Sequence, residues 1–183
     1  MHNDIDSILH HETTILSRLD GMARDIMRDY QGKDFTVVAI LQGGLILMAD
    51  LLRRVQLPLL IETITVSSYH GGTESSGTVT FLQNRLPDLT GRHVILLDDI
   101  LDSGRTLHAI RGKLTAECAP ASVRICVLLR KRKHRACAVD ADYVGFDIDD
   151  EFVVGYGLDY EGRYRNLPYI GVLKPEAIGH AAG

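Results

Sequence analysis

Cysteine and long apolar runs are both scarce in this sequence of 183 residues. The three cysteines, Cys118, Cys126 and Cys137, are odd in number and none forms a CxxC pair. This pattern predicts reduced thiols, and neither a disulfide framework nor a cysteine-bound metal. No apolar run approaches the roughly 20 residues that a membrane-spanning helix needs, and the N-terminus lacks the apolar core of a signal peptide. We therefore expect a cytoplasmic protein that does not enter a membrane.

An excess of positive charge is also missing. The net charge is −4, which argues against a dedicated nucleic-acid-binding protein, although it does not exclude a local basic patch. Hydrophobic residues make up 45% of the chain, so it is globular rather than disordered. The sequence shows no internal repeat, linker or boundary. We expect residues 1–183 to form a single domain with a sizeable core.

A strand–turn–helix junction stands at the centre of the sequence. Val94 to Leu97 is an apolar run of the kind found in buried strands, and Asp98 and Asp99 follow it. Residues 102–106 are small or polar, and apolar residues at helical spacing begin at Leu107. A turn of this kind, placed where the N–H groups of a helix are unpaired, makes an anion site, most naturally for phosphate. The acidic pair suits ribose hydroxyls or Mg²⁺, which prefers oxygen ligands.

Two other interpretations of the junction stay open at this point. An acidic pair after a strand also occurs in Mg²⁺-binding receiver domains and other doubly wound folds. Residues 102–104 could also form an ordinary helix cap without a ligand.

Alternating strands and helices indicate an α/β fold with a mainly parallel sheet. A second glycine turn, at residues 42–44, also falls at the carboxyl end of a strand, where such sheets bind ligands. Residues 5–30 have helical spacing and predict one or two packing helices. The expected strands are 35–41, 59–69, 78–82, 94–97, 123–129, 143–148 and 152–156, with further helices at 45–54 and from 107 to about 117.

Two polar segments have alternative interpretations. His70 to Gly77 is small, polar and glycine-rich, which is typical either of a mobile loop between strands or of an active-site lid. Arg130 to Arg135 is a basic run, which predicts a solvated loop or, less simply, a nucleic-acid footprint.

The central junction closely resembles the phosphoribosyl-diphosphate (PRPP) binding motif of type I phosphoribosyltransferases. Further blocks, in matching order from about Thr13 to Leu173, resemble the hypoxanthine-guanine phosphoribosyltransferases. They are Leu41-Gln42-Gly43-Gly44, Ser67-Ser68-Tyr69, Leu128-Leu129-Arg130-Lys131, and Phe152 to Tyr160 followed by Arg165. The resemblance implies the type I fold, a mainly parallel twisted sheet flanked by helices. It also implies a small hood from the N-terminal and C-terminal segments and a flexible catalytic loop at about 68–78.

The reaction implied by the resemblance needs Mg²⁺. A nitrogen of hypoxanthine or guanine attacks the anomeric carbon of PRPP, pyrophosphate leaves, and IMP or GMP forms in purine salvage. A homodimer or homotetramer is expected, with no membrane partner and no nucleic-acid partner.

The resemblance assigns a role to each matching position. The catalytic residues are Asp102, which would take the N7 proton, and Ser68 and Tyr69, which would begin the closing loop. The residues for PRPP and its phosphates are Asp98, Asp99, Asp102, Ser103, Gly104, Arg105, Thr106, Gln42, Gly43 and Arg165. The purine residues are Lys131, Phe152 and Val153, and the Mg²⁺ residues are Asp98, Asp99 and Asp159.

Lys131 bears on the choice of base because a lysine donates hydrogen bonds and cannot accept them. It favours 6-oxopurines over adenine, but xanthine also carries a 6-oxo group. Two residues depart from the family pattern. Asp98 stands where many relatives have Glu, and Gln42 stands where many have Lys or Arg. A phosphoribosyltransferase for xanthine or another base, and a nucleic-acid-binding regulator that senses PRPP or nucleotide, remain the alternatives.

Overall fold

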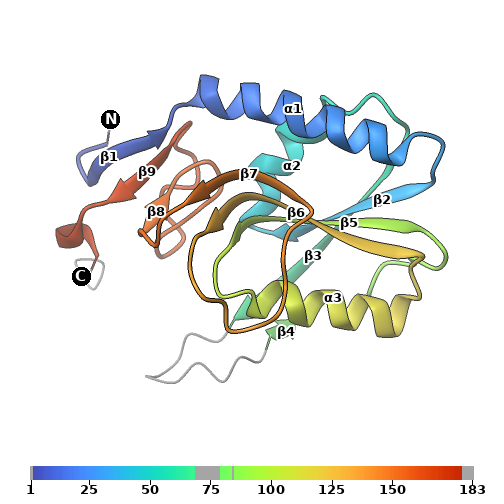
Figure 1. The fold of residues 1–183 in the computed structure, drawn as a ribbon. Helices are drawn as coiled ribbons and strands as arrows, with labels where there is room; N and C mark the ends of the chain where they lie inside the picture. Colours follow the sequence, from blue (N-terminus) through green and yellow to red (C-terminus); the bar gives the residue numbers. More distant parts are fainter. Residues whose placement is uncertain (1, 69–78, 84, 179–183) are drawn as a thin grey trace.

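The computed structural model describes residues 2–68, 79–83 and 85–178, which form a large and a small sheet (Figure 1). In the described residues the large sheet has six strands in the order β4-β3-β2-β5-β6-β7. All neighbouring strands are parallel except β4, which pairs antiparallel with β3. The bounds are β2 Phe35–Leu41, β3 Leu60–Ser68, β4 Val79–Phe81, β5 His93–Leu101, β6 Ser122–Lys131 and β7 Tyr143–Ile148. The predicted α/β class with a mainly parallel sheet is confirmed.

Helices cover both faces of the large sheet, with α1 and α2 on one face and α3 on the other (Figure 1). The bounds are α1 Glu12–Tyr30, α2 Gly44–Leu52 and α3 Arg105–Cys118. Helix α1 buries Ile15, Leu19, Met22 and Ile26, whose spacing places them on one side of the helix. Side chains of α3 pack with the other face of the sheet in a second apolar cluster. Within the described ranges, none of the helices has the length and apolar character needed to span a membrane.

The small sheet joins the two ends of the chain. It contains β1 (Ile5–His10), β9 (Ile170–Leu173) and β8 (Val153–Val154), all antiparallel. The prediction that residues 5–30 are entirely helical is therefore wrong for the first six positions of that range. Ile5 is fully buried in a cluster with Val154 and Leu173. Local periodicity could not reveal this strand, because the strand with which it pairs lies at the other end of the sequence.

The central strand is longer than its apolar run. Strand β5 continues to Leu101, and its pairing with β6 extends through Asp98 and Ile100. The two acidic residues thus lie within the sheet, whereas the sequence pattern placed them after the strand. Their backbone is fixed by strand pairing, so the direction of their side chains is fixed with it.

Candidate active site

The loop from β5 into α3 lines a cavity of about 250 Å³, formed by residues 98–104, 106 and 107. Gly104 precedes the helix in the left-handed region, at φ 79°. A Cβ at this position would lie 2.6 Å from Val139 Cγ1, so both the conformation and the packing require glycine. The first turn of α3 presents backbone N–H groups to the cavity, beside the side chains of Ser103 and Thr106.

Asp98 and Asp99 both line this cavity. Asp98 is 8% exposed, and its Oδ1 accepts a hydrogen bond of 3.0 Å from the Asp99 N–H. Burial, together with the neighbouring Asp99 charge, raises the pKa of Asp98 well above its usual range. Burial also raises the pKa of Asp99, with Asp159 adding to the shift and Arg165 opposing it. The site therefore concentrates negative charge that a cation or hydroxyl donors would stabilise.

The donor set fits Mg²⁺ better than a metal enclosed by protein. Among the described residues no group of three or more His, Cys, Asp or Glu side chains is placed to hold a metal ion. Mg²⁺ usually binds through one or two carboxylates and completes its shell with water and substrate phosphates. Asp98 and Asp99 supply such a pair in the lining of the cavity.

Two segments meet beside Asp99: the turn at residues 42–44 and the connection between β8 and β9, which contains residues 157–165. A Cβ on Gly43 would overlap the Asp99 carboxylate, and one on Gly157 would overlap the Gly43 carbonyl oxygen. Arg165 Nη1 donates to the Gly157 carbonyl at 2.6 Å, and Nη2 lies 2.7 Å from Asp159 Oδ1. Residues that lie far apart in the sequence are thus held together at the sheet edge. Close backbone approach explains the glycines.

Gln42 is exposed at the start of α2. The Leu41–Gln42 peptide bond is cis, and the Gln42 carbonyl accepts a hydrogen bond of 3.1 Å from the Leu45 N–H. The side chain stands at the surface of the turn whose glycine packs on Asp99.

The other side of the site is formed at the ends of β6 and β7. Lys131 is 8% exposed, and its Nζ lies 2.9 Å from Asp150 Oδ1 and 3.5 Å from Asp102 Oδ2. A hydrogen-bond donor and a carboxylate therefore stand side by side at the mouth of the site. Phe152, at 43% exposed, meets the Tyr160 ring edge-on with 5.4 Å between centroids. Val153 is buried in β8 and pairs with Val172.

Sequence reasoning missed Lys133 and Asp150. Lys133 Nζ lies 2.5 Å from Asp102 Oδ1 and 3.0 Å from Asp150 Oδ1, so with Lys131 these residues form a network of two lysines and two aspartates. The signal was available in the sequence. The basic run follows β6 and the acidic residues 149–151 follow β7, and neighbouring parallel strands bring such segments together.

The basic run is largely paired within the chain. Arg130 donates a bidentate pair of hydrogen bonds to the Asp147 carboxylate, at 2.6 and 3.1 Å, and a third hydrogen bond of 3.2 Å to Asp140. The hydrogen bond to Asp147 is the main cause of a raised Arg130 pKa. The remaining ion pairs are Arg132 with Asp149 at 3.8 Å and Arg135 with Asp140 at 3.7 Å. Aspartates thus offset most of the charge that a nucleic-acid footprint would need.

Comparison with known proteins decides the family. The model of the phosphoribosyl transferase domain family matches residues 5–161. The chain belongs to this family. It is a transferase with the type I phosphoribosyltransferase fold, as the sequence resemblance implied.

Similar proteins give the match in detail. The hypoxanthine-guanine phosphoribosyltransferase of Streptococcus pneumoniae (strain R6) is 43% identical over 180 residues, which cover 98% of this chain and 99% of the relative. The bifunctional protein TilS/HprT of Listeria innocua is 44% identical over 176 residues, but the matched region spans only 27% of that longer protein. A crystal structure of a hypoxanthine phosphoribosyltransferase from Staphylococcus aureus has a TM-score of 0.90 at 44% identity, covering 97% of this chain and 96% of that one.

Part of the predicted catalytic machinery of this phosphoribosyltransferase lies outside the described residues. Tyr69 and the predicted loop at 70–77 fall there. Ser68 ends β3 and pairs with Val79 through the backbone, and its side chain is not described.

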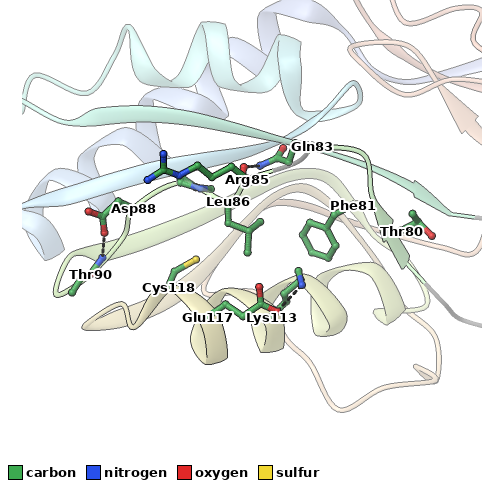
Figure 2. Close-up of a pocket in the computed structure, with 11 residues that line it drawn as sticks. Thr80, Phe81, Gln83, Arg85, Leu86, Asp88, Thr90, Lys113, Glu117 and Cys118 are labelled. Atoms are coloured by element: carbon green, nitrogen blue, oxygen red, sulfur yellow. Dashed lines mark hydrogen bonds and ion pairs between the residues drawn. The ribbon is translucent and has the colours of Figure 1, made fainter.

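A larger cavity, of about 800 Å³, lies between β4, the segment before β5, and α3 (Figure 2). It shares no lining residue with the cavity at the acidic pair. Three of its charged side chains already have partners, because Lys113 Nζ lies 2.6 Å from Glu117 and Asp88 accepts a hydrogen bond from the Thr90 N–H. The smaller cavity is the candidate active site, because it combines the carboxylates with a helix N-terminus.

Proposed function

We propose that this phosphoribosyltransferase transfers the 5-phosphoribosyl group from PRPP to hypoxanthine or guanine, giving IMP or GMP and pyrophosphate in purine salvage. The observation that carries the proposal is the position of Lys131 Nζ, 3.5 Å from Asp102 Oδ2. Asp102 begins the turn at residues 102–106, which we call the phosphate loop. A 6-oxopurine presents its O6 acceptor next to N7 on one edge. A donor and a carboxylate at this separation suit that edge.

The 5-phosphate would bind in the loop at the start of α3. Backbone N–H groups and the hydroxyls of Ser103 and Thr106 supply donors, and Gly104 and Arg105 complete the turn. Asp98 and Asp99 would accept hydrogen bonds from the ribose hydroxyls and help to hold Mg²⁺. Donation from hydroxyls would relieve the repulsion between the two buried carboxylates.

Asp102 would act as the general base. As the purine nitrogen forms its bond to the anomeric carbon, the bond from that carbon to pyrophosphate breaks. The N7 proton, made acidic by the new bond, passes to Asp102. A carboxylate beside the sugar also stabilises the positive charge that the anomeric carbon acquires, as in glycoside hydrolysis.

The leaving pyrophosphate would lie where the turn at residues 42–44 meets the connection between β8 and β9. The Gly43 backbone, the exposed Gln42 and Arg165 surround this position, and Asp159 would help to hold a second Mg²⁺ ion. Asp159 is already bound by Arg165 and by the Gly162 N–H at 2.7 Å, which orients its carboxylate. Bound Mg²⁺ would neutralise charge on the leaving group.

The base would stack on Phe152, whose ring is exposed, while the Val153 backbone reads its pyrimidine edge. We further propose that Ser68 and Tyr69 begin a loop, at about 68–78, that closes over the site, because PRPP must be protected from water. In this proposal residues 1–183 act as one domain with the small sheet as its hood. It works in the cytoplasm as a homodimer or homotetramer.

Product formation tests the proposal. The purified protein is incubated with PRPP, Mg²⁺ and either hypoxanthine, guanine, xanthine or adenine, and nucleotide and pyrophosphate are quantified. We expect equal amounts of IMP or GMP and pyrophosphate, and loss of turnover when a chelator removes Mg²⁺. Turnover with xanthine alone would mean that xanthine is the substrate, in place of hypoxanthine and guanine. Full activity in excess chelator would contradict the role given to Mg²⁺.

A further inference from the structure

Lys133 has no role in the mechanism above, yet its Nζ lies closer to the Asp102 carboxylate than that of Lys131 does. Its Nζ lies 2.5 Å from Asp102 Oδ1, while Lys131 stands 3.5 Å from the other carboxylate oxygen, Oδ2. Each oxygen of the Asp102 carboxylate thus faces a lysine, and the lysine at Oδ1 is the nearer of the two. Lys133 also contacts Asp150 at 3.0 Å, which ties it to the segment after β7.

The segment that carries Lys133 is attached to the phosphate loop by more than this ion pair. The Ala136 N–H donates to the Ser103 carbonyl at 3.1 Å, and Val139 occupies the space beside Gly104. The Lys133 side chain is 29% exposed, so much of its stem is covered by protein. These contacts fix the distance between the lysine and the loop that contains Asp102.

We infer that Lys133 is a positioning residue for Asp102: it holds Oδ1, so that Oδ2 faces the N7 proton of the bound purine. The inference rests on the proposed function, because it gives Asp102 the role of base. The side chain of an aspartate rotates freely unless its oxygens are held, and a small displacement of a catalytic group can cost up to about 100-fold in rate. The contact with the Asp102 carboxylate is the main cause of a raised pKa for Lys133, so the lysine is charged at neutral pH.

The first test removes the charge and keeps the stem. In Lys133→Met we expect the single-turnover rate of IMP formation to fall about tenfold, with KM for hypoxanthine within about twofold of its original value. Lys133→Arg should recover most of the rate. Arg132→Met is the matched control, because it removes a neighbouring, more exposed charge that pairs with Asp149 and not with Asp102. Its rate should stay within about twofold of that of the unaltered protein. If Lys133→Met does not fold, Lys133→Gln replaces it.

The second test asks whether Lys133 acts through Asp102. In an Asp102→Asn background, Lys133→Met should cause no further loss, because the base is already absent. Losses that multiply would overturn the inference, and so would an unchanged rate in Lys133→Met. A KM for hypoxanthine that rises more than tenfold at constant rate would mean that Lys133 binds the base directly, which also overturns it. A protein that is inactive with every 6-oxopurine would instead overturn the proposed function, and the inference with it.

Discussion

The two regions of the proposed active site differ in how their charges are balanced. The phosphate side is the end of β5 with the loop into α3, and the base side is formed by the segments that follow β6 and β7. On the phosphate side, Asp98 and Asp99 are like charges in adjacent positions of a buried strand, and burial raises the pKa of both. On the base side, lysines alternate with aspartates, and Lys131 has carboxylate partners on two segments. The first region needs a cation and hydroxyl donors to be stable in its charged form. The second is neutralised by its own chain, so in the proposed function the base would compete with existing ion pairs. Asp102 belongs to both.

The largest effect is expected where the two regions meet. Asp102→Asn keeps the shape of the side chain but cannot take a proton, so kcat should fall by about 10²–10⁴. PRPP should still bind, because the backbone donors of the loop are unchanged. Single-turnover rates and PRPP titration measure the two quantities separately. An unchanged single-turnover rate would remove Asp102 from the role of base.

The next largest effect comes from the packing of the phosphate side. In Gly43→Ala the new Cβ would overlap the Asp99 carboxylate, so we expect a loss of about 1–3 kcal/mol in the free energy of unfolding and a large loss of activity. Gly112→Ala is the matched control in α3, because nothing lies within 4 Å of its Cβ position. That change should stabilise the helix by about 0.5–1 kcal/mol. Denaturant unfolding compares the two variants. Equal effects would mean that the Gly43 turn can move away from Asp99.

Asp98→Asn tests whether the buried charge of the phosphate side lowers the stability of the folded protein. Because the pKa of Asp98 is raised in the folded state, its contribution to stability is present at low pH and is lost as pH rises through the folded pKa. The neutral amide avoids that loss. Without Mg²⁺, the variant should therefore unfold at a higher Tm than the unaltered protein, by about 2–4 °C. The difference should grow from pH 5 to pH 8, and activity should fall. A difference that shrinks with rising pH would contradict the account.

How far the sequence predicts each region follows from the range of the interactions. The turn before α3 could be predicted from the sequence, because it depends on a few consecutive residues and places Gly104 in a conformation that suits glycine. The network of Lys133 and Asp150 was not predicted, since it depends on which segments follow neighbouring strands. Strand β1 was taken for helix because its partner, β9, is at the far end of the chain. The roles of all the site residues, including Ser68 and Tyr69, remain predictions.

The smallest expected effect concerns Gln42, which is exposed and uncharged where the family resemblance leads us to expect a basic residue. A unit charge about 4 Å from a phosphate is worth about 1 kcal/mol in water, so Gln42→Lys should tighten pyrophosphate binding several-fold. Purine binding should change less, and the gain should shrink as salt is added. Calorimetric titration of pyrophosphate with Mg²⁺, at low and high salt, measures this. Equal affinities at low salt would mean that the side chain points away from the ligand.

The ratio of kcat/KM for hypoxanthine to that for adenine tests the central claim most directly. Lys131 is a pure donor in a largely buried position beside Asp102. In the proposed function it would pair with a 6-oxo group and would face a second donor when the base is adenine. Sites built to hydrogen-bond one group reject an analogue that cannot pair, often by more than about 100-fold. The account predicts a ratio of at least about 100. Equal values for the two bases would show that Lys131 does not read the 6-position, and would contradict the proposed function.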